Sequence, residues 1–220
     1  MAWKNLRLFH IAGGGLEPDT VMKKLEGFRF DGYEGIKKFE VWDEFQELRV
    51  DYLFKVPRFV RVFRLGEGDV LEEEKIPMET LVRVEVHIRP SGLVEVYGPP
   101  AFIRRVVETL SVLGEVDPVI FTQKEFEKVI KMSDDIKKVR VYETQDEHVV
   151  EVALFGGGLS LSKEFGRYRS KGKIREVSGR IELPGDSYGF SMNENSIKFF
   201  VRDPETSQRD LEAFIDSLLS

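Results

Sequence analysis

The sequence contains no cysteine, only three histidines and no long apolar run. Without cysteine the chain has no disulfide framework, no thiolate zinc site and no cysteine nucleophile. The apolar stretch near the N-terminus covers only about half a dozen positions before the glycines at 13–15, which is too short to cross a bilayer and lacks the layout of a signal peptide. We therefore expect a cytoplasmic protein with no membrane partner.

Charged side chains are abundant, whereas side-chain amides are scarce. Charged residues make up 33% of the chain, and Asn and Gln are few. This balance favours ion-pair networks over heat-labile side chains, so we expect a thermophilic, archaeal source. The net charge of -6 argues against a protein that coats nucleic acid over its whole surface, although it allows a local basic site.

One stretch of sequence occurs twice. Residues 35–45 read GIKKFEVWDEF, and residues 135–145 read DIKKVRVYETQ. The repeated positions are Ile36, Lys37, Lys38, Val41 and Trp42, which recur as Ile136, Lys137, Lys138, Val141 and Tyr142, and Leu53 and Phe54, which recur as Leu154 and Phe155. Such self-similarity predicts a tandem duplication. We place the repeats at residues 1–114 and 115–220.

Both repeats predict the same order of elements. A short strand (residues 5–11 and 116–121) leads into an amphipathic helix (residues 19–27 and 123–132), several strands follow, and a longer helix closes the repeat (residues 100–113 and 206–219). Residues 82–89 alternate apolar and polar side chains, which predicts a strand with one buried and one solvated face. Short turns between strands predict an antiparallel sheet with the helices on one face. The fold class is therefore α+β.

The helices carry recognisable start signals and buried stripes. Thr122 followed by Glu125 predicts a capping box at the start of the helix at 123–132. Apolar spacing predicts the residues that each helix buries. They are Phe126, Val129 and Ile130 in this helix, and Val106, Leu110 and Leu113 with Leu211, Ile215 and Leu218 in the two closing helices.

This order of elements, repeated once in tandem, resembles the TATA-binding-protein fold and its relatives, among them the kinetochore proteins CENP-L and CENP-N. The resemblance lies in element order and implies a sheet whose face or rim binds nucleic acid or protein. The TATA-binding protein itself wedges paired phenylalanines into the minor groove. Phe199 and Phe200 are neighbours in a predicted strand and point to opposite faces, so we do not expect sequence-specific TATA binding.

Residues 163–180 form a basic segment with a net charge of +5. Five of its cations fall on every second residue, so a strand would project all of them from one side. Such a row suits the phosphates of DNA or RNA, with a tyrosine stacking on a base. The residues predicted to bind nucleic acid are Lys163, Arg167, Tyr168, Arg169, Lys171, Lys173 and Arg175. The alternative is a solvated edge strand that its charges protect from aggregation.

Residues 65–80 form an acidic counterpart with a net charge of -5, which we interpret as a loop. Its charged residues are Glu67, Asp69, Glu72, Glu73, Glu74 and Glu79, against Lys75. An acidic loop and a basic segment would be complementary in a homo-oligomer or toward a protein partner. The alternative is a flexible charged loop.

No combination of residues predicts catalysis. The glycines at 13–15 could hold an anion at a helix start, but they lack the Gly-Lys-Ser/Thr ending of a phosphate loop, and a tight turn is the alternative. His10, His87 and His148 lack metal-binding spacing and are predicted to be structural. We therefore predict no catalytic residue, cofactor or metal. The expected function is a non-enzymatic nucleic-acid-binding module, with a protein-interaction or assembly factor as the alternative.

Overall fold

The computed structural model describes residues 2–13, 15–42, 46–65, 71–146, 149–202 and 207–220. The chain divides into two compact units: a first unit of His10–Asp117, and a second unit of Met1–Phe9 with Pro118–Ser220. Both units combine helices with antiparallel strands, as the α+β prediction requires. No helix in the described ranges is long and apolar enough to span a membrane.

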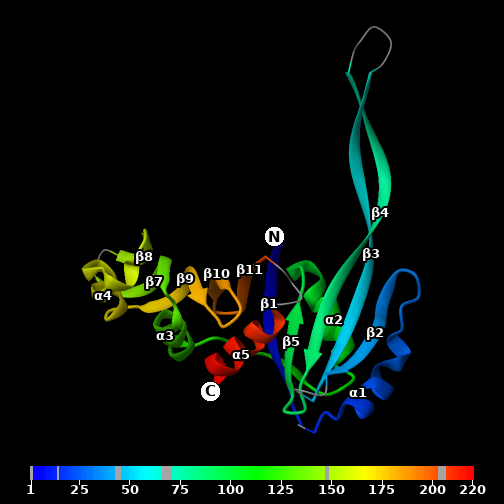
Figure 1. Cartoon of the computed structure of the whole chain (residues 1–220), viewed down its shortest axis with the longest axis horizontal. Helices are drawn as coiled ribbons and strands as arrows, with labels where there is room; N and C mark the ends of the chain where they lie inside the picture. Colours follow the sequence, from blue (N-terminus) through cyan, green and yellow to red (C-terminus); the bar gives the residue numbers. More distant parts are fainter. Residues whose placement is uncertain (1, 14, 43–45, 66–70, 147–148, 203–206) are drawn as a thin grey trace. The chain divides into compact units, whose positions relative to one another are not determined.

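The first unit holds a four-stranded antiparallel ladder in the order β2-β3-β4-β5 (Figure 1). Its elements are α1 (Pro18–Leu25), the single-turn helix η1 (Glu26–Phe28), β2 (Glu34–Trp42), β3 (Glu47–Leu65), β4 (Leu71–Ile88), β5 (Leu93–Tyr97) and α2 (Pro100–Leu110). Helix α2 packs on the base of β3. The rings of Phe54 and Phe102 lie 4.8 Å apart, and the Tyr52 hydroxyl lies 3.2 Å from Thr109 Oγ1.

The second unit holds strands in the order β1-β11-β10-β9-β7-β8. Its elements are β1 (Ala2–Ile11), β6 (Val116–Pro118), α3 (Gln123–Met132), β7 (Asp135–Asp146), β8 (Val149–Phe155), the single-turn helix η2 (Leu159–Leu161), α4 (Lys163–Arg169), β9 (Lys173–Glu182), β10 (Ser187–Asn193), β11 (Ser196–Val201) and α5 (Gln208–Leu219). The boundaries between the units fall within β1 and within β6.

We placed the first strand in the first repeat, and in the structure β1 spans the boundary between the two compact units. Strand β1 pairs antiparallel with β11, from Ala2↔Val201 to Leu6↔Ile197. Because this ladder fixes the strand at its start, residues 1–9 cluster with the second unit rather than with residues 10–117.

The predicted helix signals are confirmed in α3. Thr122 Oγ1 accepts a hydrogen bond from the Lys124 amide, and the Glu125 carboxylate accepts one from the Thr122 amide at 2.7 Å. Burial raises the pKa of Glu125, but the hydrogen bonds from Thr122 outweigh it and hold that pKa below its ordinary value. The stabilisation by this carboxylate is therefore present above the ordinary pKa of glutamate and is lost as pH falls through the depressed value.

The predicted buried stripes are confirmed as well. All three apolar positions of α3 and all six of the two closing helices are buried. Helix α2 ends at Leu110, three residues before the predicted end, and α5 is described from Gln208. These stripes supply much of the core because side chains at this spacing share one helix face.

Candidate interaction surfaces

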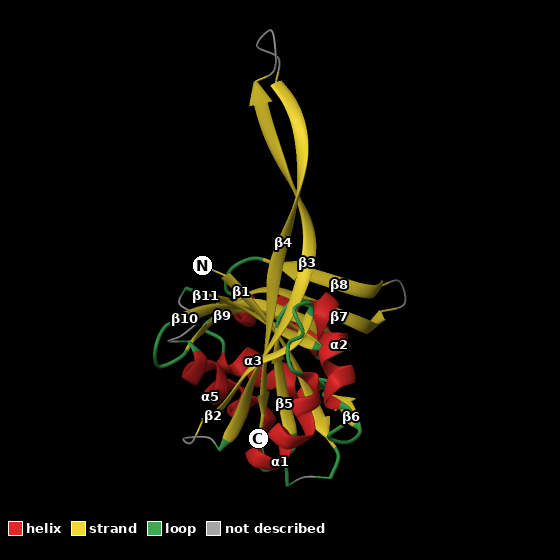
Figure 2. Cartoon of the chain, turned by 90° about the vertical axis from the view of Figure 1, so that its right-hand side faces the viewer, coloured by secondary structure: helices red, strands yellow, loops and turns green. Residues whose placement is uncertain are grey.

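Strands β3 and β4 form a ribbon that extends well beyond their neighbours (Figures 1 and 2). Their ladder runs without interruption from Leu48↔Ile88 to Leu65↔Leu71. Strand β2 pairs with β3 only as far as Phe54, and β5 pairs with β4 only from Glu85. We call residues 55–65 and 71–81 the arm. A two-stranded ribbon by itself is only marginally stable in water. The stability of an arm of this length therefore has to be explained by the side chains on its faces.

One face of the arm continues the buried face of the sheet. Even-numbered residues of β3 and β4 share a face, and at the base Val50, Phe54 and Val86 are buried. Farther out, the same face carries Val56, Val60, Val62, Ile76 and Met78, which we call the apolar face of the arm. Val60 and Met78 remain 41% and 51% exposed. Core-like side chains therefore continue past the point where the core ends.

The opposite face of the arm alternates aromatic rings with charge pairs. Phe59 and Phe63 are 70% and 61% exposed, with Arg61 between them. Arg61 pairs with Glu73 at 3.3 Å, and Lys55 with Glu79 at 2.5 Å. The hydrogen bond to Glu79 raises the pKa of Lys55. This face therefore carries both exposed aromatic rings and charge pairs.

Two prolines restrict pairing along the edges of the arm. The Lys55 amide donates outward to the Tyr33 carbonyl at 2.6 Å, so the odd-numbered amides of β3 point away from β4. Pro57 occupies the next outward position, and Pro77 occupies the corresponding position of β4, opposite Phe59. Proline has no amide to donate, so these positions oppose the addition of a further strand.

The described part of the acidic segment, residues 71–80, is a strand and not a loop, so the prediction is wrong for these residues. Glu72, Glu73, Glu74 and Glu79 lie in β4, while Glu67 and Asp69 fall outside the described residues. Cross-strand cations hold three of these glutamates: besides the pairs of Glu73 and Glu79 above, Arg64 lies 3.3 Å from Glu74. Pairing with a basic partner strand thus offsets the weak strand propensity of an acidic run.

The row of cations predicted in residues 163–175 does not form, because this segment is not one strand. Residues Lys163–Arg169 form α4, which begins where Ser162 Oγ accepts a hydrogen bond from the Phe165 amide at 3.0 Å. Phe165 is 1% exposed. The cap and this buried ring favour a helical turn, so the residues of α4 follow helical rather than strand spacing. Lys171 lies in the following turn, and Lys173 and Arg175 lie in β9.

Several of these predicted nucleic-acid ligands are paired with carboxylates. Arg169 bonds with Glu127, Lys173 pairs with Glu143 at 2.5 Å, and Arg175 pairs with Glu194 at 3.1 Å. The hydrogen bond from Lys173 lowers the pKa of Glu143. Arg167 stacks 5.4 Å from the centre of the Tyr168 ring, and Lys163, Arg167 and Lys171 are exposed.

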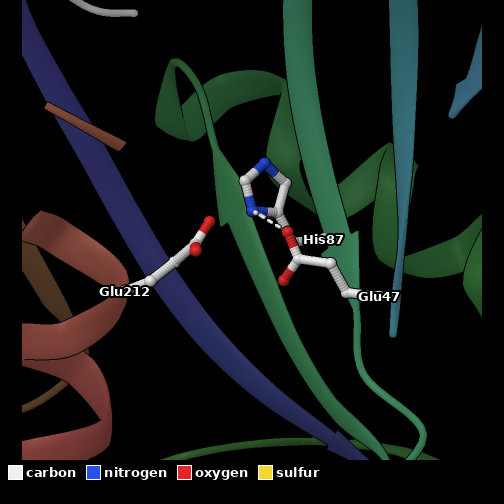
Figure 3. A group of neighbouring side chains, drawn as sticks. All are labelled: Glu47, His87 and Glu212. Atoms are coloured by element: carbon white, nitrogen blue, oxygen red, sulfur yellow. Dashed lines mark ion pairs between the residues drawn. The ribbon is translucent and has the colours of Figure 1, made fainter. Parts of the chain in front are cut away.

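A buried polar cluster lies on the sheet of the first unit, where we expected a solvated strand face. His87, Glu47 and Glu95 are all 0% exposed. His87 Nε2 lies 2.8 Å from Glu85. The Nδ1 atom of the same ring lies 3.5 Å from Glu47 (Figure 3). Carboxylates therefore lie next to both ring nitrogens of His87.

The other singled-out residues have local roles. Gly15 adopts a positive φ angle of 64°, which fits the tight turn considered for the glycines at 13–15. Gly158 also has a positive φ angle, of 66°. The Gly158 amide donates to Asp135 at 2.8 Å. His10 is exposed, and His148 and Gly14 lie outside the described residues.

No family model matches the chain, and no curated protein matches it. The function must therefore be argued from the residues.

Proposed function

We propose that this protein is a non-enzymatic protein-interaction module that assembles with a second copy of itself through the apolar face of the arm. The observation that carries the proposal is the apolar face itself, which continues a buried sheet face beyond the core and leaves Val60 and Met78 half exposed. Burial of such side chains against a partner is favourable in proportion to their area. Pro57 and Pro77 direct docking to this face rather than to the strand edges.

Charge supports a second copy as the partner. On the apolar face β3 contributes Arg58 and Arg64, whereas β4 contributes Glu74. A two-fold axis parallel to the strands places β3 of one copy over β4 of the other. Arg64, which pairs with Glu74 of its own arm at 3.3 Å, then also lies over the strand that carries Glu74 in the partner. The arm is therefore self-complementary in this orientation.

The size of the face predicts the strength of association. Its eleven residue pairs, from Lys55↔Leu81 to Leu65↔Leu71, present about 350 Å² at about 3.3 Å per residue and 4.8 Å per strand. Two such faces bury about 700 Å², less than the ~1,200 Å² at the lower limit of standard interfaces. We therefore expect a weak, reversible dimer.

Val60→Asp is expected to weaken dimerisation at least ~10-fold, because it places a carboxylate among the apolar side chains of the interface. Sedimentation equilibrium over about 10 to 300 µM protein measures the dissociation constant, a range suited to a weak dimer. Because Val60 is 41% exposed, the substitution leaves the fold of the unit largely unaffected.

Phe59→Ser is the matched control, since it removes a more exposed ring from the opposite face of the same strand. It should leave the dissociation constant within about twofold. A wild-type protein that stays monomeric across the range, or a dimer that Phe59→Ser disrupts and Val60→Asp does not, contradicts the proposed docking face.

We also propose that the two units descend from one ancestral unit, arranged as in the TATA-binding-protein fold with the helices on one face. A shared irregularity supports this origin. The ladder shifts register between Ile36 and Lys38 in β2, and between Ile136 and Lys138 in β7. A bulge at the same point of a repeated sequence is a feature that related structures keep.

The same irregularity indicates which strands correspond. It occurs where β2 pairs with β3 and where β7 pairs with β9, so β9 is the counterpart of β3. Phe54 of β3 is 1% exposed, whereas Phe155 of β8 is 69% exposed. We therefore propose that β8, η2 and α4 are an insertion in the second repeat, and that Leu154 and Phe155 are not the counterparts of Leu53 and Phe54.

Nucleic-acid binding through the basic segment is the second candidate, favoured by the exposure of Lys163, Arg167 and Lys171. Replacing these three residues with alanine should lower the log-log salt slope of oligonucleotide binding by about 0.7 to 0.9 for each phosphate that the variant no longer neutralises. Fluorescence anisotropy at about 50 and 200 mM salt measures this slope. Alanine at the exposed Lys23 and Lys24 of α1 is the control. An unchanged slope in the triple variant removes these residues from the site.

A further inference from the structure

A hollow of about 200 Å³ opens on the sheet of the second unit. It is lined by Arg180 of β9, Ser187 and Gly189 of β10, Phe200 of β11, and Arg202 just beyond that strand. Gly189 pairs with Arg180 on one side and with Phe200 on the other. Because glycine has no side chain, the sheet backbone is uncovered between the guanidinium group and the aromatic ring.

The polar groups around the hollow favour an anion. Within the described residues no carboxylate pairs with Arg180, and Arg202 Nη1 lies 3.9 Å from Asp186, at the limit of an ion pair. Asp186 is engaged by the Ser187 amide, which donates to it at 2.7 Å. Ser187 Oγ is buried and makes no hydrogen bond with the described residues. Two guanidinium groups and a hydroxyl therefore converge on one small space.

Phe200 adds a surface of a different kind. Its neighbour Phe199 points into the core and is 0% exposed, so the ring of Phe200 is directed to the opposite face of the sheet, where it lines the hollow. An aromatic face next to arginines is a common platform for stacking a nucleobase. The hollow thus offers one place for an oxyanion and one for a flat ring.

We propose that this hollow binds a nucleotide, with its phosphate held by Arg180, Arg202 and Ser187 and its base stacked on Phe200. A phosphate monoester carries a charge of about -1.5 to -2 near neutral pH and accepts several hydrogen bonds, which matches two guanidinium groups. The hollow is smaller than the ~300 Å³ of pockets that enclose drug-sized ligands, so the sugar stays exposed. The nucleotide is either free or part of a single strand.

Isothermal titration with adenosine monophosphate, adenosine, inorganic phosphate and a short single-stranded oligonucleotide tests the proposal. We expect adenosine monophosphate to bind at least ~10-fold more tightly than either of its parts, because only it uses both surfaces. Arg180→Gln and Arg202→Gln should each weaken binding at least ~10-fold. Phe200→Leu should remove the advantage over inorganic phosphate. If the oligonucleotide binds much more tightly than the mononucleotide, and Arg180→Gln weakens both to the same extent, the ligand is a nucleotide within single-stranded nucleic acid.

Lys198→Gln is the matched control, because Lys198 is an exposed cation of β11 that does not line the hollow. It should leave binding of adenosine monophosphate unchanged, as should Val60→Asp in the arm, so this site and the arm are tested separately. Absence of binding by every probe at about 1 mM overturns the proposal, because a dissociation constant well above this concentration is too weak for a specific site. Binding that Arg180→Gln and Arg202→Gln leave intact overturns it equally.

Discussion

Glu95→Ala is expected to lower the free energy of unfolding by about 3 to 5 kcal/mol, the cost of removing one partner from a buried charged pair. The Glu95 carboxylate is 0% exposed. It accepts a hydrogen bond from Arg89 at 2.6 Å and another from the Tyr97 hydroxyl at 2.6 Å. Its removal takes a partner from a guanidinium group that is only 15% exposed. Arg89 then loses one of its partners where water has little access.

The matched control is Glu108→Ala in α2. Glu108 also pairs with an arginine, Arg104, at 2.9 Å, but the two side chains are 61% and 88% exposed. A solvated pair of this spacing contributes only about 0.3 to 0.5 kcal/mol. Urea unfolding followed by circular dichroism compares the two variants. Similar losses of stability for both would contradict the argument that burial makes the hydrogen bonds of Glu95 important.

Regular periodicity made much of the fold predictable. Residues 82–88 alternate apolar and polar side chains, and they form the base of β4 as expected. The buried stripes of α2, α3 and α5 and the cap at Thr122 were also predicted correctly, because helix spacing and capping hydrogen bonds depend on residues that are close together in the sequence.

The arm could not be predicted because its sequence lacks a clear period. Apolar residues of β3 lie on both faces there, each strand contains a proline, and the acidic run of β4 is typical of a loop. Its strand conformation depends on cations of β3, which precede it in the chain and pair with it across the ladder. In α4 the prediction failed in a different way, because a strand was expected where a helix forms. Alternating charges suggested a strand, but the cap at Ser162 and the burial of Phe165 favoured a helix.

The candidate sites depend on contacts between segments far apart in the sequence. His87 alternates with apolar neighbours as a solvated residue would, yet it is 0% exposed beside Glu47, which belongs to the preceding strand. Arg180 and Arg202 share a hollow only because β9, β10 and β11 pair in a particular register. No local pattern specifies that register, so neither the polar cluster nor the hollow was visible in the sequence.

Phe199→Ala is expected to lower the free energy of unfolding of the second unit by about 3 to 5 kcal/mol. Phe199 is 0% exposed, and its ring meets that of Phe214 edge to face, with centroids 5.3 Å apart. The substitution leaves a cavity between β11 and α5 and removes an aromatic pair that contributes about 0.5 to 1.5 kcal/mol beyond its buried area. Thermal unfolding measured by calorimetry detects the loss of stability.

Phe200→Ala provides the internal comparison, because it removes the same ring from the next residue of the same strand. Phe200 lines the hollow on the other face of the sheet and is only partly buried, so we expect a decrease of less than about 1.5 kcal/mol. A large difference between the two variants agrees with one ring in the core and one at a binding surface. Equal decreases would mean that Phe200 is needed for folding, and the stacking role assigned to it would have no basis.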